Sequence, residues 1–140
     1  FLCIKICKVT INLIRKFVAY SKMITNIYVD GSGGAKSGYG FFVKETGESF
    51  FEEKPGITNN QAEYLAIISA LKKYEKLNGE IIIYSDSKNT VNQLNHTFAI
   101  NNEQLRSLAR DAWSLISKFS NLKIIWIPRG ENLAGKMLGS

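Results

Sequence analysis

Three carboxylates occupy places along the sequence where acidic side chains can act together. Asp30 closes an apolar, strand-like segment just before the glycine-rich Gly31–Gly34, and Asp86 closes a second such segment just before Ser87. Glu63 lies one turn into a predicted helix. Because ligand sites in α/β proteins gather where the strands of the sheet end, we expect these three carboxylates to converge on one side of a sheet.

Such a cluster would suit divalent metal chemistry. Carboxylates at close range repel one another unless positive charge neutralises them, and hard oxygen ligands favour Mg²⁺ or Mn²⁺. Taken singly, each acid also has a structural explanation: Asp30 as a turn residue, and Glu63 and Asp86 as acids near a helix start. The sequence offers no Ser–His or Cys–His pair as a competing nucleophile, since the single histidine, His96, stands in a polar segment expected to be a solvated loop.

Length and composition describe one ordinary globular domain. The chain has 140 residues, of which 45% are hydrophobic and 21% charged, with a mean hydropathy of −0.08. These values exclude a disordered tail, a collagen-like fibre and a disulfide-stapled mini-protein. Apolar runs are broken by Lys or Arg well short of the roughly 18 residues that a bilayer span needs, so we expect no membrane association.

The net charge of +6 is concentrated in residues 1–22, which hold five basic residues and no acid. Residues 23–140 carry 13 basic and 12 acidic side chains, so a global basic patch gives no argument for nucleic-acid binding. We interpret residues 1–22 as a basic N-terminal extension, either an over-long start before Met23 or an appendage; an amphipathic surface helix is the alternative. Both cysteines, Cys3 and Cys7, lie there. A cysteine-free domain over 23–140 suits a reducing compartment, and we expect a cytoplasmic protein.

Hydrophobic periodicity predicts the elements that must position the acids. The expected strands end near Asp30 or cover 40–43, 49–52, 80–84 and 122–127, with a hairpin turn at Thr46-Gly47 and the last two strands buried. The expected helices cover 59–76, a short segment capped by Ser87, and 101–119, followed by the start of another helix. A strand meander followed by alternating strands and helices predicts an α/β fold, with a mixed sheet flanked by helices.

Four segments in this order resemble the type 1 ribonuclease H family, most closely its compact archaeal and bacterial members without a basic protrusion. They are IYVDGSGG, TNNQAEYLAIISAL, IIIYSDSKNTVNQL and IIWIPRGEN, and the resemblance covers roughly residues 24–139. It implies a ribonuclease H-like, five-stranded mixed sheet. It also implies that Asp30, Glu63 and Asp86 are the catalytic and metal-binding residues, that two divalent cations (Mg²⁺ or Mn²⁺) are the cofactors, and that the RNA strand of RNA–DNA hybrids is cleaved.

The resemblance extends to residues that would contact the hybrid. By position in the motifs it implicates Gly31, Ser32, Asn60 and, more weakly, Asn59. Amide side chains both donate and accept hydrogen bonds, and the 2′-hydroxyl distinguishes RNA from DNA. Helix capping by Thr58 or Asn59 is the structural alternative. Arg129 follows the last predicted strand, where family members carry a mobile His or an Arg; it either assists the phosphate or product release, or is a surface charge.

The chain departs from the family pattern at its C-terminal end. Many members open the last helix with an Ala-Asp pair whose Asp completes the metal site, whereas this chain has Gly135 or Lys136 in that place, depending on the alignment. Glu131 is the nearest acid and is expected to face solvent, and the last helix is expected to be short or truncated.

Two functions therefore stay open: a ribonuclease H, or a hybrid- or double-strand-binding protein with an incomplete metal site. Another nuclease or integrase-type enzyme of the same fold fits the TNNQAE segment poorly. We expect a monomer without an obligate protein partner.

Overall fold

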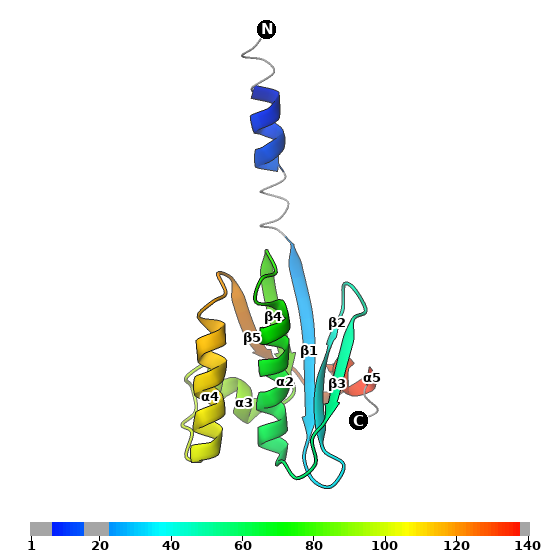
Figure 1. Cartoon of the computed structure of the whole chain (residues 1–140), viewed down its shortest axis with the longest axis vertical. Helices are drawn as coiled ribbons and strands as arrows, with labels where there is room; N and C mark the ends of the chain where they lie inside the picture. Colours follow the sequence, from blue (N-terminus) through cyan, green and yellow to red (C-terminus); the bar gives the residue numbers. More distant parts are fainter. Residues whose placement is uncertain (1–6, 16–22, 138–140) are drawn as a thin grey trace.

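The structure is a computed structural model that describes residues 7–15 and 23–137. Part of the predicted N-terminal extension and the last three residues therefore lie outside the described residues. Residues 7–15 form a helix whose side chains are all exposed, and the helices after it are labelled from α2 onward (Figure 1). Within the described ranges, no helix has the length and apolar character needed to cross a bilayer.

The domain is built on one five-stranded sheet with the order β3-β2-β1-β4-β5. The first three strands form an antiparallel meander, β4 pairs in parallel with β1, and β5 pairs in parallel with β4 (Figure 1). This arrangement confirms the predicted mixed sheet. The strands are β1 (Ile24–Ser32), β2 (Gly38–Val43), β3 (Ser49–Glu53), β4 (Glu80–Ser85) and β5 (Leu122–Trp126).

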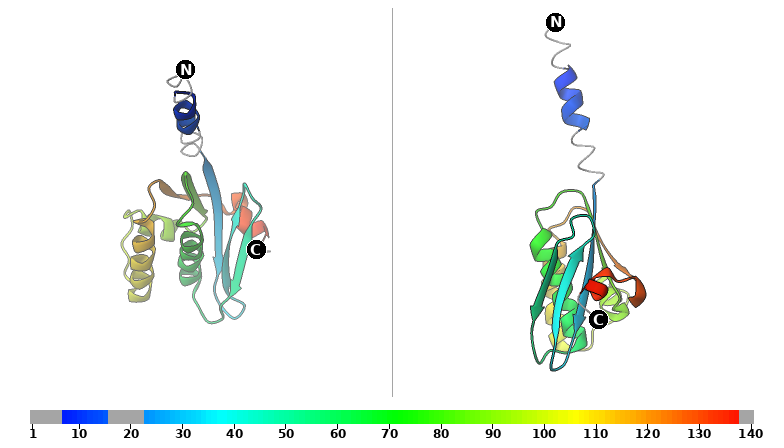
Figure 2. Two further views of the ribbon diagram at one scale, coloured as in Figure 1. Left: turned by 45° about the horizontal axis from the view of Figure 1, so that its top comes forward. Right: turned by 90° about the vertical axis from the view of Figure 1, so that its right-hand side faces the viewer.

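Two long helices cover one face of this sheet, and a short C-terminal helix lies on the other (Figure 2). The long helices begin at side-chain caps: the Thr58 hydroxyl accepts from the Gln61 N–H at 3.1 Å, and the Asn102 amide oxygen accepts from the Leu105 N–H at 3.0 Å. The helices are α2 (Asn59–Tyr74), α3 (Lys88–Leu94), α4 (Glu103–Ile116) and α5 (Leu133–Met137), with the 3₁₀ turn η1 (Arg129–Glu131) before α5.

The main core lies between the sheet and the two long helices. Ile27 and Val29 of β1 and Ile83 of β4 are fully buried there, against Ile67 and Leu71 of α2. Each such side chain contributes about 1.5–3 kcal/mol relative to an exposed position. The alternation of buried and less buried residues along β1 and β4 follows the two-residue period of a strand.

The expectation that the last two strands are buried on both faces is wrong. In β4 only alternate residues are buried, and in β5 only Ile124 is. Tyr28 and Tyr84 stack on the less covered face, with ring centroids 4.8 Å apart. The reason is that the long helices cover only one face of the sheet and that β5 is an edge strand.

Element boundaries differ from the predictions by a few residues. β1 continues to Ser32, where it still pairs with Gly38 of β2, although its pairing with β4 ends at Tyr28 and Tyr84. Asp30 therefore lies beyond the parallel ladder but inside the antiparallel one.

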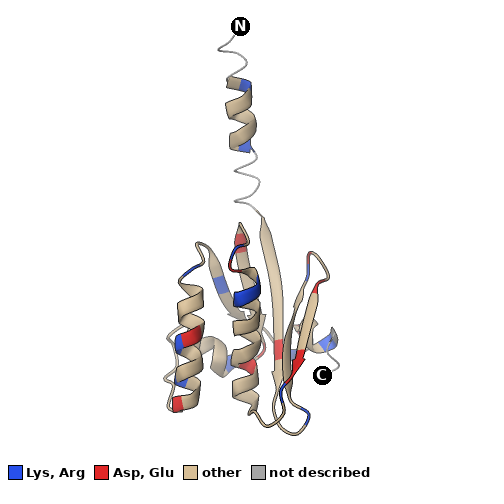
Figure 3. Ribbon diagram, in the orientation of Figure 1, with Lys and Arg blue, Asp and Glu red and all other residues tan. Residues whose placement is uncertain are grey.

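Basic and acidic residues are interspersed along the described domain, in agreement with its nearly balanced charge (Figure 3).

Candidate metal centre

Asp30, Glu63 and Asp86 form one cluster, in which one carboxylate oxygen from each side chain lies within 4.8 Å of the others. Asp30 comes from β1, Glu63 from the second turn of α2, and Asp86 directly follows β4. The predicted convergence of the three carboxylates is therefore present. Among the described residues, no further His, Cys, Asp or Glu joins this group.

Two glycines let the start of α2 approach β1 closely enough to build this cluster. A Cβ atom on Gly31 would stand 2.4 Å from the carbonyl carbon of Ala62 and 2.7 Å from the backbone nitrogen of Glu63. A Cβ atom on Gly33 would stand 2.3 Å from the backbone nitrogen of Asn59. No L-residue with a side chain fits such contacts without a shift of the backbone, so the glycines fix the distance from strand to helix.

The residues that the family resemblance links to substrate lie around this junction. The side-chain oxygen Oδ1 of Asn59 accepts a hydrogen bond from the Gly33 N–H at 2.6 Å. This oxygen therefore holds the glycine turn. Ser32 and Asn60 are exposed next to it. Thr58, not Asn59, caps α2. Ser32, Asn59 and Asn60 are therefore the exposed members of the set, and Gly31 and Asn59 also shape the site.

Burial and like charge act together on Glu63. Its side chain is only 8% exposed, and its Oε2 atom is buried without a hydrogen-bond partner. Desolvation, followed by the charges of Asp30 and Asp86, raises the pKa of Glu63 to about 9, against smaller opposing effects of the Gly31 N–H and Arg129. A divalent cation would supply both the missing positive charge and a partner for this oxygen. The three carboxylates fit a site for such an ion.

Asp86 is held by two side chains that sequence reasoning did not name as functional. The amide of Asn132, which is fully buried, donates from Nδ2 to Oδ2 of Asp86 at 3.1 Å and to the Val29 carbonyl at 2.9 Å. The indole N–H of Trp126 donates to the Asp86 carbonyl at 3.1 Å. Asn132 also accepts from the Ala134 N–H at 3.1 Å. An Asn just before a helix start is the signal that could have pointed to this residue.

No acid takes the place of the fourth family carboxylate among the described residues. In α5, Gly135 is buried and Lys136 is exposed, and Glu131 is exposed in η1 as expected. Arg129 is exposed and close enough to the cluster for its charge to lower the pKa of Glu63. The centre thus combines three carboxylates with the positively charged side chain of Arg129 close by.

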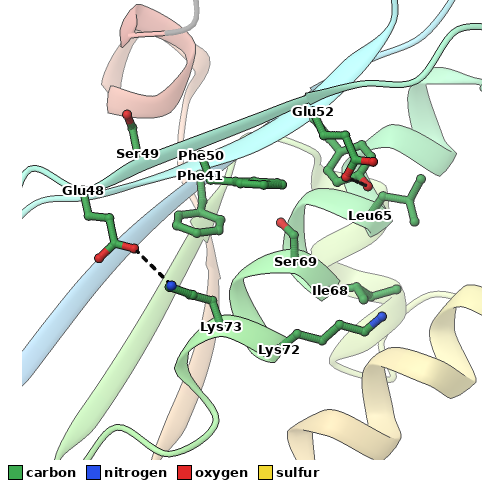
Figure 4. Close-up of a pocket in the computed structure, with 11 residues that line it drawn as sticks. Phe41, Glu48, Ser49, Phe50, Glu52, Leu65, Ile68, Ser69, Lys72 and Lys73 are labelled. Carbon is green, nitrogen blue, oxygen red and sulfur yellow. Dashed lines mark hydrogen bonds and ion pairs between the residues drawn. The ribbon is translucent and has the colours of Figure 1, made fainter.

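His96 and the largest of the described grooves, two other features that could have carried function, do not belong to the carboxylate cluster. His96 is exposed in the predicted loop, with a left-handed backbone (φ 63°) and its ring stacked on Trp113 at a centroid distance of 4.8 Å. A groove of about 510 Å³ between the β2–β3 hairpin and α2 has an aromatic and aliphatic lining, crossed by the Lys73–Glu48 ion pair at 3.8 Å (Figure 4). This groove shares no lining residue with the carboxylate cluster. The candidate site is marked by its three carboxylates.

Comparison with known proteins agrees with this geometry. A family model described as reverse transcriptase-like matches residues 42–139. The chain is 30% identical over 120 residues to EbsB of Enterococcus faecalis, which its name classes provisionally as a hydrolase; the match covers 80% of this chain and 88% of EbsB.

Solved structures of ribonuclease H domains share the fold. The N-terminal RNase H domain of Rv2228c from Mycobacterium tuberculosis is 28% identical, with a TM-score of 0.72 over 79% of this chain and 86% of that one. RNase H1 of Halobacterium salinarum is 26% identical, with a TM-score of 0.74 over 83% and 94%. LC11-RNase H1, solved with an RNA/DNA hybrid, is 22% identical and shares the fold, with a TM-score of 0.73 over 81% and 92%. The predicted ribonuclease H-like fold and the family resemblance are confirmed.

Proposed function

The chain belongs to the reverse transcriptase-like family, and we propose that it is a metal-dependent endonuclease that hydrolyses the RNA strand of RNA–DNA hybrids. One observation carries this proposal: the carboxylates of Asp30, Glu63 and Asp86 converge within 4.8 Å beside a buried oxygen that has no hydrogen-bond partner. The similarity to ribonuclease H domains supports the reaction class.

Asp30, Glu63 and Asp86 would hold the cofactors, two divalent cations of the Mg²⁺ or Mn²⁺ type. When bound, such ions supply activation of a water molecule on one side of the phosphodiester and stabilisation of the leaving 3′-oxygen on the other. The role of the chain is to hold the three carboxylates in this arrangement. Glu63 must give up its proton before it can serve as a ligand, because its pKa without an ion is raised to about 9.

The exposed polar groups beside the cluster would bind the hybrid. Ser32 and Asn60 lie at the strand–helix junction next to the carboxylates and offer donors and acceptors for a 2′-hydroxyl. The Oδ1 atom of Asn59 already accepts from Gly33, so its amide N–H groups are the part suited to substrate. Arg129 would place its charge near a phosphate. The hybrid bound to LC11-RNase H1, which shares this fold, supports the substrate class.

A second function has its own supporting observation. The cluster contains three carboxylates, and the described part of α5 contributes none. A chain with only these three carboxylates at its site could bind hybrids or double strands without cleaving them. The two functions differ in product formation, not in affinity.

Cleavage of an end-labelled RNA–DNA hybrid in Mg²⁺ or Mn²⁺, compared with binding in Ca²⁺, tests the proposal. We expect the parent protein to cut only the RNA strand. Asp86→Asn should abolish cleavage and leave binding in Ca²⁺ measurable, whereas Asp111→Asn, an exposed acid on α4, should cleave like the parent. Binding without cleavage by the parent in either ion would favour the second function.

A further inference from the structure

We propose that Asn132 and Trp126 are positioning residues that hold Asp86 from two sides and thereby set the metal affinity of the site. The proposal rests on the proposed function, because it assumes that Asp86 is a metal ligand. Asn132 acts on the carboxylate of Asp86 and Trp126 on its backbone carbonyl. These two contacts come from different elements and are independent of each other.

The contacts of Asn132 determine the orientation of its own amide. Both N–H groups of Nδ2 have acceptors, the Val29 carbonyl and Oδ2 of Asp86, and Oδ1 accepts from the Ala134 N–H. Reversal of the amide would place its oxygen against two other oxygens. Since the side chain is fully buried, such a loss would cost the full desolvation penalty.

A fixed amide in turn fixes the Asp86 carboxylate. Donation to Oδ2 selects one rotation of the carboxylate and leaves Oδ1 as the oxygen that Asn132 does not engage. The donor is neutral, so it orients the carboxylate without cancelling the negative charge that a cation needs. An ammonium group in this place would compete with the ion.

Trp126 holds the backbone of Asp86, which lies just beyond the last residue of β4 paired with β5. Asp86 is the first residue after β4, and Ser85 is the last residue paired with β5, opposite Trp126. The Trp126 indole N–H reaches forward from that last pair to the Asp86 carbonyl at 3.1 Å. Trp126 is 43% exposed, and its ring centroid lies 5.8 Å from the Lys88 ammonium. This exposure suits a specific polar contact better than a core packing role.

Each ligand of a three-carboxylate site must be placed well, since no fourth acid among the described residues compensates for a misplaced one. Residues that orient metal ligands through hydrogen bonds typically change metal affinity or activity by about 10- to 100-fold when they are removed. We expect effects of this size for both residues.

The chain contains a matched pair of tryptophans for the test. Trp113, the other of its two tryptophans, donates its indole N–H to the Leu94 carbonyl at 3.0 Å, away from the cluster. Trp126→Phe and Trp113→Phe each remove one indole hydrogen bond to a backbone carbonyl. Titration of each variant with MnCl₂ alone in a calorimeter should show Mn²⁺ affinity about 10-fold or more below the parent for Trp126→Phe, and within about twofold for Trp113→Phe.

A second pair keeps the test independent of any one variant. Asn132→Ser retains an oxygen that can cap the Ala134 N–H but lacks the amide donors. Asn95→Ser removes a hydrogen bond that the Asn95 amide donates to the Ile124 carbonyl of β5 at 3.0 Å, instead of one to Asp86. Asn132→Ser should lose Mn²⁺ affinity like Trp126→Phe, and Asn95→Ser should not. Hybrid cleavage should show a fall in kcat at an unchanged KM, with partial recovery at high Mn²⁺, which a loss of stability alone would not produce.

The outcomes separate the two proposals. Mn²⁺ affinities of the Trp126 and Asn132 variants within twofold of the parent would overturn the positioning roles, and so would equal losses in the Trp113 and Asn95 controls. A parent that binds Mn²⁺ but leaves the hybrid intact would defeat the proposed function, while the affinities still decide the positioning roles. A parent that binds no Mn²⁺ would defeat both.

Discussion

Gly31 lies so close to Ala62 that a Cβ atom on the glycine would stand 2.4 Å from the alanine carbonyl carbon. Asp30 directly precedes Gly31, and Glu63 directly follows Ala62. The contact between these two small residues therefore sets the distance between the two acids. The candidate metal centre depends on backbone packing as much as on its carboxylates.

Gly31→Ala should separate Asp30 from Glu63. The added methyl group meets backbone atoms that cannot rotate away, so we expect a loss of about 1–3 kcal/mol in the free energy of unfolding and a marked loss of Mn²⁺ binding. Urea denaturation followed by circular dichroism gives the first value, and calorimetry gives the second. Gly130→Ala is the matched control, because a Cβ atom there meets nothing within 4 Å. Equal behaviour of the two variants would show that the close approach is not required.

The metal-free protein should lose stability as the pH rises from about 5 to 9. Burial and the neighbouring acids raise the pKa of Glu63 from 4.5 to about 9, so the folded state keeps a proton that the unfolded state releases. Stability then falls by up to about 1.4 kcal/mol per pH unit in this window. Glu63→Gln, which cannot ionise, should be more stable than the parent at pH 8 and should show a flatter profile.

Saturating divalent ions should cancel this pH dependence. An ion bound by ionised Glu63 stabilises the folded state more as the pH rises, because less work is needed to remove the proton. Urea denaturation at pH 6 and pH 8, with EDTA and with MnCl₂, measures the effect. A parent whose stability in EDTA follows that of Glu63→Gln across this range would show that the carboxyl group is already ionised without a metal.

The sheet and the three acids could be predicted from the sequence because local patterns determine them. Alternation in β1 and the capping pair Thr58 and Gln61 are visible as residue types at short spacing. The exposure of β5 could not be predicted in this way. Its apolar residues resemble those of β4, and only the strand order shows that it lies at the edge of the sheet.

The supports of Asp86 depend on contacts far apart in sequence. Asn132 is 103 residues from Val29 and 46 from Asp86, and Trp126 is 40 residues from Asp86. A single sequence contains no periodic signal for such pairs. The cap signature could have suggested that Asn132 begins a helix, but not that its amide reaches a metal ligand.

The basic N-terminal extension should add nucleic-acid affinity without being needed for the fold. The hydrophobic core begins with β1, and residues 1–22 carry five basic side chains and no acid. Deletion of 1–22 should leave the circular dichroism spectrum and hybrid cleavage of the domain intact. It should weaken binding to random-sequence duplex DNA and lower the slope of log affinity against log salt by about 1 or more. An unfolded truncated protein would show instead that the extension packs into the domain.

The missing fourth carboxylate should limit activity in Mg²⁺. With Asp30, Glu63 and Asp86 alone, a second ion has few anionic ligands, and Mn²⁺, whose ligand demands are less strict than those of Mg²⁺, should give the faster cleavage. In α5, Gly135→Asp or Lys136→Asp should then raise the rate in Mg²⁺ toward that in Mn²⁺, because either change adds a carboxylate in the helix that follows Asn132.

Lys136→Gln separates this gain from the removal of a positive charge. If the new carboxylate acts as a ligand, Lys136→Asp should exceed Lys136→Gln in Mg²⁺, and the advantage should shrink in saturating Mn²⁺. Equal rates for the two Lys136 variants would assign the effect to charge removal alone. A parent already as fast in Mg²⁺ as in Mn²⁺, with no gain from either acid, would show that three carboxylates and the Asn132 amide complete the centre. Initial rates of RNA-strand cleavage over a series of Mg²⁺ and Mn²⁺ concentrations distinguish these cases, because a new ligand shifts the metal concentration at half-maximal rate and a remote charge changes it little at high ionic strength.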